Sequence, residues 1–266
     1  MEMLTSCPAG DGPWLTFYGG AYDAAFVAVH PFYTIPGHQS REYAPRTVHI
    51  KRSALGADLS GSQLVAAADQ IAGAHCLGRL DPSLVDGLAK QSGCQVTWKQ
   101  LGSQVGLDTL GAVNRALCTS IGSLRAEFAD PDGARRLARY CDTHAVFIPS
   151  DGRFQPVMQR AIARLFRESG VNMVEAAAEF DETGRQLLPA TLDADGPWDD
   201  ETGVPKNTTR LFATDRSLLV TVEWDSFFTL ICGRAERLAH VPVADLFDGF
   251  WCDASTSNSW WRGHML

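Results

Sequence analysis

The sequence lacks the short motifs that mark the commonest catalytic sites. Its 266 residues contain no HExxH, no GxSxG, no Walker phosphate loop and no dinucleotide-binding glycine fingerprint. Each of these motifs supports a defined chemistry, such as zinc-dependent hydrolysis, attack by a serine, or phosphate binding by backbone N–H groups. The sequence therefore gives no indication of standard hydrolase or nucleotide chemistry.

Paired cysteines are also lacking. The seven cysteines form no CxxC pair and no Cys–His cluster at zinc-finger spacing. The opening residues, MEMLTSCPAGDGPW, have neither the basic nor the apolar region of a secretory signal. An odd number of cysteines without an export signal argues against a disulfide framework. We therefore expect mostly buried thiols, no structural zinc, and a cytoplasmic protein.

Long apolar runs and excess positive charge are absent as well. No window approaches the roughly 18 continuous apolar residues that predict a membrane span, so no membrane insertion is expected. The chain carries 31 acidic and 23 basic residues, a formal net charge of −8. This charge disfavours binding to nucleic acids or anionic membranes, which depends on concentrated Lys and Arg. It favours a small cationic ligand or a basic protein partner.

What the sequence does contain predicts a single α+β domain over residues 1–266. Apolar runs near both ends, including Ala24–His30 and Leu218–Gly233, are typical of strands, and apolar residues recur at helical spacing between about 60 and 140. We expect a mixed or antiparallel sheet of N- and C-terminal strands, with the central helical segment over one face. The acidic stretch at about 192–209 has the prolines and glycines of a loop or lid.

Two acids stand out in Leu218–Gly233, which reads as one long core strand. Alternation would place Trp224 on the core face, and Glu223 and Asp225 together on the other face. Residues two apart on a strand are separated by roughly 6.5–7 Å. The pair could therefore hold a cation, a guanidinium or a network of backbone and hydroxyl partners. An ordinary solvated strand face is the alternative interpretation.

A candidate metal ligand, His30, ends the apolar run AAFVAVH and precedes an aromatic, proline-containing turn. A neutral imidazole in such a place can bind a metal or haem iron through one nitrogen while the other donates a hydrogen bond. The alternative is a core histidine whose hydrogen bonds are satisfied within the protein.

A helix-turn-helix pattern covers residues 96–121, VTWKQLGSQVGLDTLGAVNRALCTSI. Gly106 occupies the position of the turn glycine, and a second helix would begin near Asp108. The exposed positions of that helix offer few side chains that read base edges. Nucleic-acid binding is therefore not expected, and a structural helical hairpin is the preferred interpretation.

Three segments of the chain, AFVAVHPFYTIPG, VTWKQLGSQVGLDTLGAVNRAL and LLVTVEWDSFFTLICG, together resemble an uncharacterised bacterial domain family. In overall character the chain is also similar to the haem-dependent L-arginine N-hydroxylases of D-cycloserine biosynthesis. That resemblance implies a monooxygenase with non-covalent haem b, an arginine substrate and an electron donor that the sequence does not identify.

If the resemblance holds, His30 would be the haem axial ligand, as inferred from its flanking residues. Glu223 or Asp225 would bind the substrate guanidinium, and the 192–209 loop would close over the pocket. Two alternatives remain open at this stage. One is a non-catalytic acidic binding or immunity protein that masks a basic partner. The other is a helix-turn-helix regulator.

Overall fold

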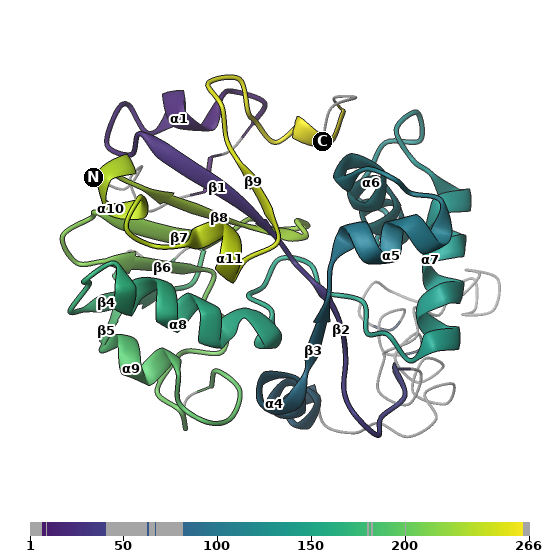
Figure 1. Cartoon of the computed structure of the whole chain (residues 1–266), viewed down its shortest axis with the longest axis horizontal. Coiled ribbons are helices and arrows are strands. Elements are labelled where there is room, and N and C mark those ends of the chain that lie inside the picture. The colour runs from purple at the N-terminus through teal and green to yellow at the C-terminus, as the bar shows by residue number, and fades with distance from the viewer. Residues whose placement is uncertain are drawn as a thin grey trace.

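The computed structural model describes residues 7–8, 10–40, 63, 67, 82–179, 181, 183–199 and 201–262. Its α+β fold, which was predicted, is built on a seven-stranded antiparallel sheet with the order β5-β4-β6-β7-β8-β1-β9 (Figure 1). N- and C-terminal strands adjoin, since β1 lies between β8 and β9. The strands of this sheet are β1 (Ala24–Val29), β4 (Val174–Ala177), β5 (Arg185–Leu187), β6 (Arg210–Ala213), β7 (Leu218–Val222), β8 (Phe228–Gly233) and β9 (Gly249–Trp251).

Helices lie on both sides of the sheet, and a two-stranded ribbon of β2 (Phe32–Thr34) and β3 (Cys94–Val96) adjoins it. No helix in the described residues is long and apolar enough to cross a membrane. The helices are α1 (Trp14–Phe17), α4 (Pro82–Ser92), α5 (Trp98–Val105), α6 (Leu110–Ser120), α7 (Pro131–His144), α8 (Gln159–Glu168), α9 (Pro189–Leu192), α10 (Ala235–Leu238) and α11 (Val243–Leu246), with 3-10 turns η3 (Pro156–Met158) and η4 (Trp260–Arg262).

Two helical layers bury the central strands on both faces. On one face Leu219 and Leu230 belong to a core shared with α1, α5, α6 and α7. On the other face Val220 and Ile231 pack in the core that contains α8. The central helical segment thus covers one face, as predicted, and α8 covers the other. This double burial explains why β7 and β8 read as an almost continuous apolar run.

The prediction of one long strand over Leu218–Gly233 is wrong. The segment folds into a hairpin of β7 and β8, in which Val222 pairs with Thr229. The chain reverses over residues 223–227, where Asp225 has a left-handed φ of 55° and the Ser226 N–H donates to the Glu223 carbonyl at 3.2 Å. Because this turn contains neither Gly nor Pro, the sequence marks it only weakly, through Asp225 and Ser226. The apolar stretch Trp14–Tyr18 also reads as a strand, but Trp14–Phe17 form helix α1 after Pro13, and Tyr18 caps its end.

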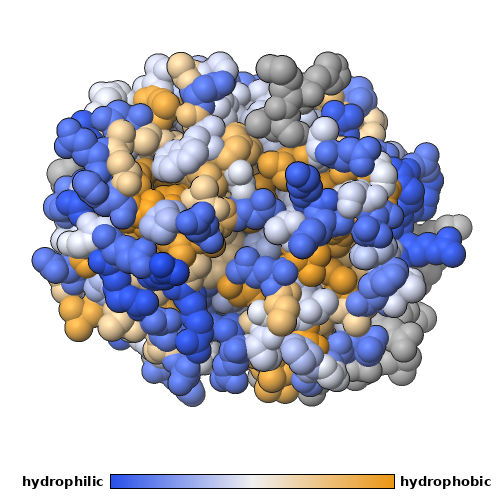
Figure 2. All heavy atoms as spheres, viewed as in Figure 1, coloured by the Kyte–Doolittle hydropathy of each residue, from blue (hydrophilic) through white to orange (hydrophobic). Residues whose placement is uncertain are grey.

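The acidic 192–209 segment is docked on the protein surface. Asp193 and Asp195 pair with Arg167 and Arg160 of α8, at 2.7 and 3.0 Å, and Trp198 is only 7% exposed. The surface over α8 is accordingly mostly hydrophilic (Figure 2). Closure of this segment over a pocket stays a prediction. The first part of the helical segment expected from about residue 60 lies outside the described residues, apart from two isolated positions that are helical.

The helix-turn-helix pattern forms as local structure. Thr97 and Gln100 make a capping box at the start of α5, Gly106 adopts a left-handed φ of 69°, and Thr109 caps α6. However, α6 is largely buried: Gly111 packs against the backbone of Trp261, and other residues of the helix enter the core. Since α6 has no exposed face for reading base edges, the structural hairpin is the interpretation that this geometry supports.

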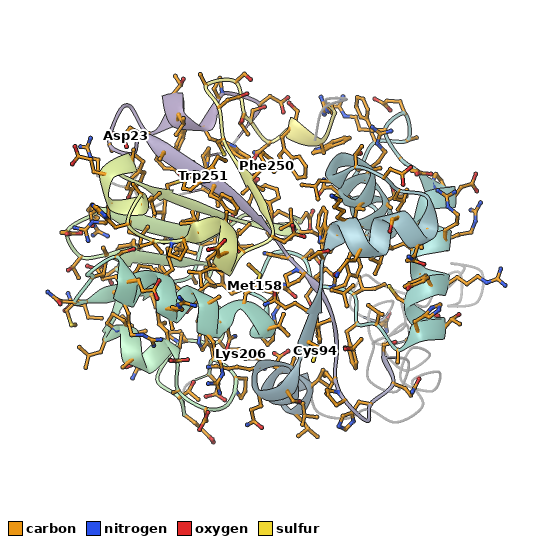
Figure 3. All side chains as sticks on the ribbon, viewed as in Figure 1. Asp23, Cys94, Met158, Lys206, Phe250 and Trp251 are labelled. Carbon is orange, nitrogen blue, oxygen red and sulfur yellow. The ribbon has the colours of Figure 1, made fainter. Side chains whose placement is uncertain are left out.

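Glycine is required where β9 approaches β1. Gly249 has a φ of 155°, and a Cβ at this position would lie 1.8 Å from the Val27 carbonyl oxygen. The approach allows Phe250 to pair with Val27, and Phe250 and Trp251 continue the sheet edge (Figure 3). From β9 the chain continues to Asn258, which is part of the site described below. The glycine therefore positions that part of the site.

We predict that Gly249→Ala lowers the free energy of unfolding by about 2 kcal/mol or more, because the added carbon displaces β9. Urea unfolding followed by circular dichroism measures this change. Gly12→Ala is the matched control, since no atom lies within 4 Å of a Cβ built there. Equal stabilities of the two variants would contradict the requirement for close strand approach.

Candidate functional site

The three residues selected from the sequence meet at the turn between β7 and β8. Glu223 and Asp225 belong to the turn, and the His30 N–H donates to the Phe227 carbonyl at 2.8 Å. Their environments differ strongly: His30 is fully buried, Glu223 is half-buried and Asp225 is exposed. Among the contacts of the described residues, none joins two of these three side chains. They therefore have separate physical roles.

His30 is a neutral core histidine with protein partners at both ring nitrogens. Its Nε2 lies 3.0 Å from Thr229 Oγ1. Its Nδ1 lies 3.3 Å from Gln155 Nε2 and faces the Ser150 carbonyl. Burial lowers the pKa of His30 to about 3. A hydrogen bond to the Ser150 backbone opposes this decrease, and the charge of Arg153 adds to it. The imidazole is thus uncharged at neutral pH.

The His30 network fixes a loop beneath the turn. The Gln155 amide donates to the carbonyls of Ser150 and Arg153, at 2.7 and 2.9 Å. The Gly152 N–H in this loop donates to the Ser226 carbonyl of the turn at 3.0 Å. Buried polar groups that all find partners restrict a region to one arrangement. The network therefore holds the loop at residues 150–155 and the 223–227 turn together.

The surroundings of His30 do not fit a haem. An axial histidine needs one ring nitrogen directed at a cavity that admits the cofactor. Here both nitrogens face protein groups and His30 has no exposed surface. Its role as axial ligand stays a prediction that this geometry does not support, and we derive no step through haem. No group of three or more His, Cys, Asp or Glu in the described part of the chain could hold a metal ion.

Glu223 is a carboxyl group in an unfavourable place for charge. Burial raises its pKa to about 7, the nearby Glu179 carboxylate adds to the increase, and a hydrogen bond from Asn258 opposes it. The Asn258 Nδ2 lies 3.3 Å from Glu223 Oε1. No Lys, Arg or His of the described residues forms an ion pair with Glu223. Glu179 is exposed to water, whereas Glu223 is half-buried. The repulsion between the two carboxylates therefore adds to the increase in the pKa of Glu223.

The amide of Asn258 is oriented by its other contacts. Trp14 Nε1 donates to its Oδ1 at 3.0 Å, which leaves Nδ2 to donate to Glu223 and to the Pro8 carbonyl at 3.1 Å. This amide assignment rests on the hydrogen-bond pattern. Trp14 and Pro8 come from the opposite end of the chain. The site therefore depends on contacts that no local sequence pattern reveals.

A buried hydroxyl lies near Glu223. Thr221, two residues earlier, is fully buried, and its Oγ1 finds no hydrogen-bond partner in the described structure. Alternation along β7 places Thr221 on the same sheet face as Leu219, where Trp14 also packs. We use the name Glu223 recess for Glu223, Thr221 and Asn258. It combines a half-buried carboxylate and a fixed amide with an unpartnered hydroxyl that is closed to solvent.

The remaining predicted groups lie outside the recess or lack reactivity. Trp224 was expected in the core, but it is 67% exposed beside the exposed Asp225, because the turn ends the strand alternation. The Cys7 thiol is near Glu223, and burial, then the Glu223 charge, raises its pKa well above the ordinary value. Burial likewise raises the pKa of four other described thiols, namely Cys118, Cys141, Cys232 and Cys252. None of these five thiols has the depressed pKa of a cysteine nucleophile.

His30 predicts a specific pH dependence of stability. Its pKa falls from 6.5 to about 3 on folding. The contribution of the neutral imidazole to the free energy of unfolding is therefore complete above pH 6.5 and is lost as the pH falls towards 3. The stability difference between wild type and His30→Gln should shrink by about 3 kcal/mol between pH 7 and 4.5. Urea unfolding at both pH values measures it. The exposed His144→Gln provides the control, and a difference independent of pH would refute the neutral buried imidazole.

Hemin addition tests the haem assignment directly. We expect no stoichiometric Soret band, because neither ring nitrogen of His30 is open to a ligand. The measurement is a hemin titration of the purified protein, with and without dithionite and carbon monoxide. A saturable band in the wild type that disappears in folded His30→Gln would restore the axial-ligand prediction.

Comparison with known proteins places these residues in a family. The model of the family "Protein of unknown function (DUF2711)" matches residues 80–262, which include Glu223 and Asn258 but not His30. The chain is similar to "Uncharacterized protein YwbB" of Bacillus subtilis (strain 168), with 26% identity over 172 residues, covering 64% of this chain and 73% of that relative. No solved structure matches the chain. The chain belongs to the DUF2711 family.

Proposed function

We propose that the Glu223 recess binds the cationic group of a small amine or guanidine, with L-arginine as the reference ligand. The observation that carries this proposal is a half-buried carboxyl group, without a cationic partner among the described residues, whose pKa is raised to about 7. Perturbed carboxyl groups of this kind are concentrated at functional sites. A bound cation would offset the free-energy cost of burying the negative charge of Glu223.

The chemistry of the recess suits a donor-rich cation. A guanidinium offers five N–H donors, and a carboxylate can accept two of them in parallel. The Thr221 hydroxyl is fully buried, so the carboxylate of Glu223 is the acceptor that a ligand would meet. Asn258, which is held by Trp14, keeps the carboxylate in place. The net charge of −8 would also attract a cation.

A small molecule suits the recess better than a basic protein partner. Glu223 is half-buried and lies beside Asn258 and Pro8, whereas the exposed acid of the same turn is Asp225. A partner protein would first meet the exposed carboxylate. Hydroxylation of a guanidine nitrogen would in addition need a cofactor that activates oxygen. The recess supports recognition of the cation, and the oxidation step remains part of the wider arginine-hydroxylase proposal.

Binding of L-arginine should depend on pH through Glu223. With a pKa of about 7, roughly one tenth of the carboxyl groups are ionised at pH 6 and roughly nine tenths at pH 8. We therefore expect about tenfold tighter binding at pH 8 than at pH 6, measured by isothermal titration calorimetry. Glu223→Gln should lose the binding and its pH dependence.

The matched control is Asp225→Asn, which removes an exposed charge from the same turn. It should leave the affinity within about twofold, since exposed charges contribute little. If Asp225→Asn weakens arginine binding as much as Glu223→Gln does, general surface charge explains the binding and the recess does not. Binding that is equal at pH 6 and pH 8 would equally contradict the role of Glu223.

A further inference from the structure

A second polar site lies at the other end of the β7–β8 hairpin. An open groove of about 510 Å³ is lined by Glu168, Ser169, Gly170, Ser217, Arg234, Glu236, Arg237 and His240. Ser217 immediately precedes β7 and Arg234 immediately follows β8, next to the pair Leu218 and Gly233. The Glu223 turn lies at the opposite end of these strands, about 20 Å away for the six residue steps from Ser217 to Glu223.

The groove is lined by two arginines and two glutamates, so its formal charge is balanced. Of the arginines, Arg237 is already paired with Asp215, whereas no ion pair among the described residues engages Arg234. Of its two acids, Glu168 already pairs with Arg164 at 2.6 Å, and Glu236 is exposed. Within the described part of the chain, no hydrogen bond or ion pair engages the guanidinium of the exposed Arg234. A guanidinium that is free at the edge of a groove is available to a ligand.

The surrounding contacts hold the groove in a fixed form. Arg237 donates to the Ser169 carbonyl at 2.7 Å and lies 3.5 Å from the Asp215 carboxylate, so it joins the end of α8 to α10. The Ala235 N–H, which follows Arg234, donates to the carboxylate of Asp23 at 2.6 Å, and Asp23 lies beside α10 (Figure 3). The backbone that carries Arg234 is therefore anchored on both sides. A site held in this way loses little entropy when a ligand binds.

We propose that this groove binds the oxyanion group of a small molecule, a phosphate or carboxylate, with Arg234 as its main contact. A guanidinium matches two oxygens of such a group bidentately. Arg237, although engaged by Ser169 and Asp215, adds a second guanidinium to the lining, and the exposed His240 adds a ring nitrogen. The exposed Glu236 opposes anion binding and thereby weakens the site. The proposal is independent of the Glu223 recess, which attracts the opposite charge.

The test uses inorganic phosphate as the probe, titrated into the full-length protein at constant ionic strength and followed by amide chemical shifts in NMR. We expect saturable shifts in residues of the groove. Arg234→Gln should weaken binding about fivefold or more, because it removes the bidentate contact. Glu236→Gln should strengthen binding, because it removes the opposing charge. Citrate in place of phosphate distinguishes a carboxylate from a phosphate preference.

Arg135→Gln is the control, since it removes one positive charge from α7, where Arg135 pairs with Asp132. It should leave phosphate affinity unchanged. Equal weakening by Arg135→Gln and Arg234→Gln would show nonspecific attraction and overturn the proposal. So would shifts that grow linearly without saturation, or a Glu236→Gln variant that binds phosphate more weakly than the wild type.

Discussion

The buried imidazole of His30 joins three parts of the chain that are far apart in sequence. It follows β1, contacts Thr229 of β8, and meets the loop that contains Ser150 and Gln155. Its carbonyl also accepts a hydrogen bond from Trp98 Nε1 of α5 at 2.6 Å, which links the sheet to the helical layer. Because these groups are buried, each unpaired one would be costly. The satisfied network thus fixes the β7–β8 turn, and with it the location of Glu223.

Burial acts on the two titratable groups of this region in opposite directions. It lowers the pKa of His30 and raises that of Glu223, since in both cases the uncharged form is favoured away from water. His30 finds neutral partners and needs no further one. Glu223 has only an amide donor in the described structure, so its charged form lacks a counterion. At the far end of the same strands no acid of the described residues pairs with Arg234, and the hairpin thus separates a half-buried carboxylate from an exposed guanidinium.

Some of this arrangement was predictable from the sequence. Alternation and apolar runs identified β1 and the helices α6 and α7, because those patterns follow directly from which faces are buried. The hairpin was not predictable, since a buried two-strand unit whose turn is Glu-Trp-Asp-Ser-Phe reads as a single strand. Glu223 was chosen for its spacing to Asp225, a reason the turn invalidates. Its raised pKa comes first from burial and then from Glu179, and Asn258, which is held by Trp14, opposes the increase; these residues are distant in the chain and carry no local signal.

The account depends most on the ionisation of Glu223, which nuclear magnetic resonance can measure through the side-chain carboxyl carbon of ¹³C-labelled glutamate, assigned with Glu223→Gln. The protein is titrated from pH 4 to pH 9 with and without L-arginine. We predict a pKa near 7 for the free protein, against the ordinary value of 4.5, and a lower pKa when arginine is present. A pKa near 4.5 that arginine does not change would contradict the proposal that this recess binds a cation.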